Sequence, residues 1–145
     1  MTKWLGWSVL AGCAYHAGSF ADRKGVSPGA HTTLGCLDLA IAQAQTSDAG
    51  TVVDYFVGNR CDQRLTFDLA HVHIIGRSAT GTEVALTAYD PRNELSPQPL
   101  AARWSGRARI EYRGAEPVVS ICAEVAGVEL VPRAKHWVCM EGSAP

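Results

Sequence analysis

Apolar side chains recur at every second position in short runs along this chain, and turn-forming residues separate the runs. A period of two places these side chains on one face of a β-strand, where they can cover a core. One stretch, near residues 37–45, is also compatible with a helix. About seven short strands with closely spaced turns predict an all-β antiparallel sandwich. The clearest runs are Val53-Tyr55-Val57, Leu65-Phe67-Leu69, Val84-Leu86-Ala88 and Ala108-Ile110-Tyr112.

One segment of the chain resembles a known class of sandwich. Tyr55-Phe56-Val57-Gly58-Asn59, followed by Leu65 to Ile74, resembles immunoglobulin-like accessory domains of secreted bacterial proteins. The resemblance implies an immunoglobulin-like antiparallel β-sandwich. It concerns the architecture, because the chain lacks the buried tryptophan between paired cysteines that marks antibody domains.

Length and charge narrow the classes of function. The 145 residues suffice for one domain, and 47% hydrophobic residues can build a core. Thirteen basic against fourteen acidic side chains give a net charge of -1. We therefore expect no nucleic-acid partner, since nucleic-acid binders normally carry a basic excess. No apolar run approaches the roughly 20 residues that a membrane-spanning helix needs.

The start of the chain has the pattern of an export signal. Lys3 precedes a short apolar stretch, which ends in Leu10-Ala11-Gly12-Cys13. These four residues resemble the lipobox of bacterial lipoproteins. In that family the cysteine thiol is acylated with diacylglycerol and the signal is cut immediately before it. The alternative is a buried N-terminal strand or helix with an incidental cysteine.

The lipobox resemblance implies a location and a domain organisation. Residues 1–12 would be a signal peptide, and a lipid on Cys13 would hold the protein in the membrane. Ala14 follows the cysteine, which resembles the pattern of Gram-negative lipoproteins sent to the outer membrane, facing the periplasm or the cell surface. Residues 13–33 would form the anchor and a flexible tether, or an ordered arm lying on the domain. Residues 34–145 would form the sandwich domain.

Four cysteines remain after the anchor: Cys36, Cys61, Cys122 and Cys139. An even number in an exported chain predicts disulfide bonds, and four cysteines allow three pairings. Free buried thiols are the alternative. Metal ligation is less favoured, because no Cys-x-x-Cys spacing occurs.

Hairpin geometry favours one of the three pairings. If Cys36 faces Cys61, the hairpin turns between Asp48 and Ala49, inside a polar turn-forming stretch. If Cys122 faces Cys139, the hairpin turns between residues 130 and 131. Directly opposed residues lie within disulfide range, so we predict these two bonds.

Each pairing also fixes which side chains share a strand face. The second register puts Val119, Ile121, Ala123 and Val125 on one core face with Val138 and Met140, and leaves Trp137 off it. The first register puts Phe56 opposite Ile41 and leaves Tyr55 and Val57 on the cysteine face. That conflict predicts a bulge near Gly58-Asn59, or a strand buried on both faces.

Three groups of side chains are candidates for binding. Arg103, Arg107, Arg109 and Arg113 alternate with apolar positions and could bind anions bidentately, or could be a solvated strand face. His71 and His73 are spaced for one face of a strand, as a metal site requires, although no third ligand is evident. Trp104 and Trp137 could stack on a partner or cover the core.

No enzymatic motif is present: there is no Gly-x-Ser-x-Gly elbow, phosphate-binding glycine loop or His-Glu-x-x-His. We expect a non-catalytic, lipid-anchored envelope protein without a cofactor, which binds a protein partner or stabilises an envelope assembly. The alternatives are a small-ligand or metal-binding lipoprotein that uses His71 and His73, and an inhibitor of a periplasmic enzyme that presents the Asp90–Pro99 loop.

Overall fold

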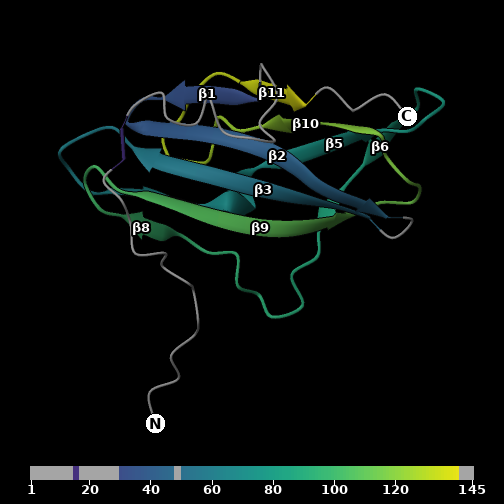
Figure 1. Ribbon diagram of the computed structural model, residues 1–145, viewed down its shortest axis with the longest axis horizontal. Helices are drawn as coiled ribbons and strands as arrows, with labels where there is room; N and C mark the ends of the chain where they lie inside the picture. The colour runs from purple at the N-terminus through teal and green to yellow at the C-terminus, as the bar shows by residue number, and fades with distance from the viewer. Residues whose placement is uncertain (1–14, 17–29, 48–49, 141–145) are drawn as a thin grey trace, which may run out of the picture.

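The structure is a computed structural model that describes residues 15–16, 30–47 and 50–140, with the backbone alone over 43–47 (Figure 1). These residues form an all-β fold, as predicted. Within the described residues, seven strands have four or more residues, four strands are shorter, and there is one 3₁₀ turn, η1 (Leu69–His71). The strands are β1 (His31–Leu34), β2 (Leu37–Ser47), β3 (Gly50–Asn59), β4 (Leu65–Phe67), β5 (His73–Arg77), β6 (Glu83–Ala85), β7 (Thr87–Ala88), β8 (Gln98–Leu100), β9 (Ser105–Arg113), β10 (Ser120–Glu124) and β11 (Trp137–Met140).

The strands form two main antiparallel sheets that face each other. One sheet has the order β1-β2-β3-β9-β7, and the other has the order β11-β10-β5-β6. Figure 1 shows β2, β3 and β9 in front of β5, β6 and β10. The chain crosses from one sheet to the other at buried Leu86, between β6 and β7. A third, two-stranded sheet joins β4 to β8.

Side chains from both sheets meet in one hydrophobic core. Ile41, Tyr55 and Ile110 come from the first sheet, and Ile74 and Ile121 come from the second. Every second residue of the predicted runs in β3, β4 and β9 points inward. Burying each large apolar side chain stabilises the fold by about 1.5–3 kcal/mol. The period of two brings these side chains into the core together, and it is therefore the main sequence signal for this sandwich.

The β2–β3 hairpin corrects the predicted register. Next to the turn, Ser47 faces Gly50, as the predicted turn requires, but a bulge between Gln43 and Gln45 then shifts the pairing by one residue. Ile41 consequently faces Tyr55 rather than Phe56, and Tyr55 lies in the core. The predicted bulge near Gly58-Asn59 is therefore wrong in place: the extra residue is in β2. The alternative, burial on both faces, holds for β3 from Val53 to Asn59.

The β10–β11 hairpin has the predicted register. Ile121 faces Met140 and Ala123 faces Val138, and all four side chains are buried. Val119 is the exception, because it precedes β10 and is 44% exposed. Val118 is buried in its place.

Both predicted disulfides are present. Cys122 and Cys139 face each other across β10 and β11, with Cα atoms 4.1 Å apart. Cys36 and Cys61 lie just beyond the ladder of β2 and β3, with Cα atoms 5.4 Å apart. The one-residue shift at the bulge thus leaves this bridge at the end of the hairpin.

Two further expectations need correction. Residues 37–45 form part of β2 and not a helix, because the long pairing with β3 outweighs local propensity. The predicted tether, 13–33, extends too far: Ala30 is buried and His31 to Leu34 pair with β2. Tyr15 also packs in a small cluster with Phe56. The signal peptide 1–12, Cys13 and most of the tether lie outside the described residues.

Among the residues that the structure describes, no helix has the length and apolar character needed to cross a bilayer.

Candidate functional site

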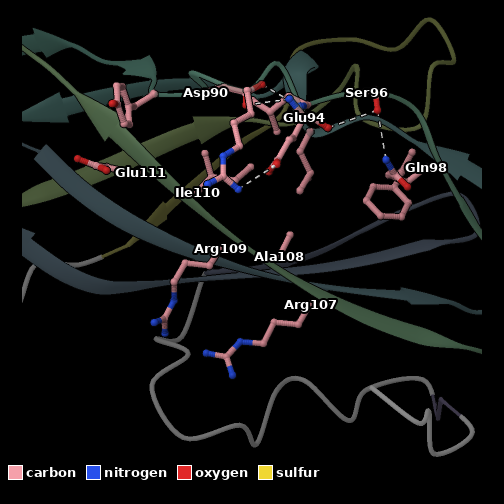
Figure 2. A pocket seen from close by; sticks show the side chains of 14 residues that line it. Asp90, Glu94, Ser96, Gln98, Arg107, Ala108, Arg109, Ile110 and Glu111 are labelled. Carbon is pink, nitrogen blue, oxygen red and sulfur yellow. Dashed lines mark hydrogen bonds and ion pairs between the residues drawn. The ribbon is translucent and has the colours of Figure 1, made fainter. Parts of the chain in front are cut away.

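A groove of about 560 Å³ lies between β9 and the segment that connects β7 to β8. We call it the β9 groove. Its walls combine apolar side chains of the core edge with polar groups of the connecting segment (Figure 2). Its apolar lining residues are Phe67, Leu69, Tyr89, Leu95, Ala108 and Ile110, and its polar ones are Asp90, Arg92, Glu94, Ser96, Gln98, Arg107, Arg109 and Glu111.

The connecting segment is held in place by its own hydrogen bonds. The carboxylate of Asp90 accepts the backbone N–H groups of Glu94 and Leu95, both at 2.8 Å. Asn93, in the left-handed region with φ 54°, donates its N–H to the carbonyl of Asp90. The N–H groups of Leu95 and Glu94 lower the pKa of Asp90 below its ordinary value. An ionised Asp90 therefore shapes this wall of the groove.

The other wall is an open strand edge. β9 pairs with β3 from Ser105 to Tyr112, but with β7 only at Tyr112 and Arg113. Tyr89 extends this second edge by donating its N–H to the carbonyl of Glu111, at 2.8 Å. Beyond that bond, no strand in the described part of the chain pairs with this edge of β9.

The side chains of Arg107 and Arg109 point away from the groove. Figure 2 shows both on the far side of β9 from Asp90, Glu94 and Ser96. Their contribution to the groove is therefore mainly backbone. The small side chain of Ala108 lies between them in sequence and faces the interior side of the sheet.

Asp54 binds both of these arginines on the outer face of the sheet. Arg109 donates Nε to Oδ1 at 2.8 Å and Nη2 to Oδ2 at 3.0 Å, and Arg107 donates Nη2 to Oδ2 at 2.9 Å. The hydrogen bond from Arg109 has the largest part in holding the pKa of Asp54 below its ordinary value. The Arg107 guanidinium also lies 5.3 Å from the centre of the Phe56 ring. Two guanidinium groups against one carboxylate leave one surplus positive charge.

The other two predicted arginines have separate partners. Arg103 precedes β9, has φ 60°, and donates Nε to Asp62 at 2.9 Å. Arg113 donates Nε to Glu111 at 3.0 Å and lies 3.3 Å from the centre of the Tyr89 ring. All four arginines of the predicted anion-binding group are therefore already paired within the chain. The structure brings only Arg107 and Arg109 together on one carboxylate.

The structure contradicts the prediction that His71 and His73 share one face of a strand. His71 ends the 3₁₀ turn η1 and lies 3.7 Å from Asp68, whereas His73 begins β5. The two imidazoles therefore do not share a strand, although both are exposed. No group of three or more metal-ligating side chains occurs in the described part of the chain.

Both tryptophans of the predicted binding pair lie at the surface. Trp104 and Trp137 are each 42% exposed, so neither is a core residue. Trp137 lies off the core face, as its register predicts, and its ring meets that of His73 edge-on with centres 6.4 Å apart.

Comparisons with protein-family models, with curated proteins and with solved structures find no match to this chain.

The β9 groove itself was not predicted from the sequence. The nearest signals were the Asp90-Pro91 and Ser96-Pro97 pairs, which mark a loop, and the arginine alternation in β9. Neither signal shows that the loop leaves β9 unpaired.

Proposed function

We propose that this chain is a non-catalytic, lipid-anchored protein of the cell envelope that binds a protein partner through the β9 groove. The observation that carries the proposal is the groove itself, which has a mixed polar and apolar lining and lies between a strand edge and a loop held by its own hydrogen bonds. Hollows that combine apolar walls with a few fixed polar groups are typical of binding sites.

The proposed location follows from two features of the chain. The lipobox-like Leu10-Ala11-Gly12-Cys13 supports lipidation at Cys13, with the outer membrane as destination. Two disulfides support an oxidising compartment, because they rarely persist in the cytosol.

The groove chemistry supports binding more than catalysis. Its charged side chains already serve the fold: Asp90 holds the loop, Arg92 lies 3.8 Å from Glu94, and Glu111 is paired with Arg113. Neither histidine nor cysteine lines it, and its carboxylates already hold the loop backbone or pair with arginines of the chain. Binding of a small ligand is the second candidate, because a groove of about 560 Å³ has the size of a small-molecule site. The predicted inhibitor role of the Asp90–Pro99 loop is less favoured, since this segment serves as the groove wall.

The location is tested by the lipid. Protein from the native host should carry the mass of an acylated N-terminal cysteine and fractionate with membranes. Cys13→Ser should lose both properties. A native protein that begins with unmodified Met1 in the cytoplasm would contradict the proposal.

Partner binding is tested by site-specific photo-crosslinking in native envelopes. A photoreactive residue at Ser96, on the groove rim, should give one discrete protein adduct. The control is the same residue at Glu83, which is exposed on β6 of the other sheet. Equal adducts at both positions, or none at Ser96, would exclude the β9 groove as the binding site.

A further inference from the structure

We propose that the β9 groove takes an extended segment of the partner, which adds as a strand to the open edge of β9 and alternates acidic with large apolar residues. This inference rests on the proposed function and specifies how the partner binds. It joins two features of β9: the backbone edge with which no described strand pairs, and the arginine pair that binds Asp54 on the outer face of the sheet.

The backbone geometry of β9 identifies the free groups. In an antiparallel ladder, successive residues direct their N–H and C=O groups to opposite edges of the strand. The carbonyl of Glu111 faces the β7 side, because it accepts the N–H of Tyr89. The pairing of β9 with β3 has no bulge, so the N–H and C=O groups of Arg107 and Arg109 face the same side, which is the groove.

These groups match what an added strand requires. Two residues spaced by two offer alternating donors and acceptors, as in peptide recognition by β-strand addition. Residues 105–109 of β9 extend over about 17 Å, enough to pair with five residues of an extended segment. Tyr89 marks one end of this site, because it already occupies the position opposite Glu111.

The inner positions of the added strand select apolar side chains. A residue opposite Ala108 would point toward the interior side of the sheet, where the groove is lined by Leu69, Leu95 and Ile110. Ala108 is small, so it leaves the space above it for a large side chain. The loop held by Asp90 closes that space from the other side.

The outer positions select acidic side chains. Residues opposite Arg107 and Arg109 would lie beside their guanidinium groups, and opposite charges attract when they face each other across a ladder. Asp54 fixes both guanidinium groups but neutralises only one charge. Their side chains remain 43% and 60% exposed, so a carboxylate of the partner can reach them.

The same charges disfavour a second copy of this chain as the occupant. If two β9 edges paired antiparallel, arginines of one copy would face arginines of the other. Like charges that oppose each other directly are destabilising.

The test uses defined peptides as probes for the intact, oxidised domain. The first is a capped seven-residue peptide that alternates glutamate with leucine or phenylalanine, and the second replaces every glutamate with lysine. We expect the glutamate peptide to bind and the lysine peptide to bind at least about tenfold more weakly. Binding of the glutamate peptide should slow hydrogen exchange at the amides of Arg107 and Arg109. Equal affinity for both peptides would refute the acidic selection.

N-methylation of the probe isolates the backbone contribution. Methylating the peptide amides that face β9 should weaken binding about tenfold, because each methyl removes a donor. Methylating the alternate amides should change the affinity by less than about threefold. Equal effects of the two sets would overturn strand addition, and this comparison leaves the protein unaltered.

A matched pair of variants tests the same point in the protein. Arg109→Ala and Arg109→Pro both lose the contact with Asp54, but only the proline variant loses the N–H that faces the groove. Proline is tolerated at an edge where its missing N–H faces outward. The proline variant should bind the glutamate peptide several-fold more weakly than the alanine variant. Equal affinities would count against strand addition.

The outcomes separate this inference from the proposed function. If Ser96 still gives its specific adduct but the peptides do not bind, the partner uses the groove in another way and strand addition is wrong. If the Ser96 adduct is also missing, the proposed function fails as well. A concentration-dependent dimer that protects the amides of β9 would instead identify a second copy as the occupant and overturn the proposal.

Discussion

Replacing both Cys122 and Cys139 with alanine should lower the free energy of unfolding by about 3 kcal/mol. The two cysteines are 17 residues apart, and closing a loop of that length restricts the unfolded chain by about this amount in the chain-entropy account. The Cys36–Cys61 bridge, with a separation of 25, should contribute only a few tenths of a kcal/mol more, because the dependence on loop length is logarithmic.

Because of the position of this bridge, its removal should destabilise β11 in particular, in addition to the whole fold. β11 is an edge strand that pairs only with β10 among the described strands. A long connection, from residue 125 to residue 136, leads into it. Without the bridge, the four-residue ladder must hold β11 alone, so Val138 and Met140 should be exposed more often. Amide hydrogen exchange should therefore accelerate in β11 more than in β3.

Urea denaturation followed by tryptophan fluorescence measures the change. In thermal melts the variant should unfold at least about 10 °C below the oxidised wild type. In both assays it should match a wild type in which this bridge alone is reduced. Non-reducing peptide mapping checks the pairing itself. A loss below about 1 kcal/mol would refute the chain-entropy reasoning. A peptide that links Cys61 to Cys122 would refute the pairing.

Three further substitutions test the interior and the outer face. Asp54→Asn should destabilise the fold by about 1–3 kcal/mol at neutral pH. Because the folded protein lowers the pKa of Asp54, the difference in free energy of unfolding between wild type and variant should be complete above the pKa of the unfolded state and should shrink as the pH falls below about 4. A difference that stays constant with pH in urea titrations would contradict this prediction. Gly76→Ala should lower the free energy of unfolding by about 1–3 kcal/mol, since a Cβ there would lie 2.4 Å from Cγ1 of buried Val118. Adding Val118→Ala should restore part of this loss, which thermal melts would measure. Tyr112→Phe should lower the free energy of unfolding by about 1–3 kcal/mol, because its hydroxyl lies 2.5 Å from that of Tyr55 and burial raises the pKa of Tyr112 to about 12. Adding Tyr55→Phe should then cost little more. Additive losses in a double-mutant cycle would exclude coupling between the two hydroxyls.

The sequence by itself determined the class of fold and the inward face of most strands. Side chains alternate between the two faces of a strand, so positions such as Leu65, Phe67 and Ile110 could be assigned to the core from their spacing alone. The same reasoning paired Cys122 with Cys139, because hairpin pairing follows from local geometry once the turn is placed.

Predictions from local geometry failed where one extra residue or an early turn changes which side chains share a strand face. A bulge at residues 43–45 shifted the β2–β3 register, and no residue type there marks it. His71 and His73 have the spacing of a strand face, but the turn η1 ends at His71. In both cases contacts with distant strands decided the local backbone.

The tertiary structure alone decided the candidate site. Asp54 binds arginines that are 53 and 55 residues away in sequence, and their meeting depends on β3 pairing with β9. Among the described strands none continues along this edge of β9, because the chain leaves it after Tyr89 and β8 pairs with β4 instead. The sequence shows which residues face inward, since that follows from the period of a strand. It does not show which strand edge stays unpaired, because that depends on how every other strand is placed.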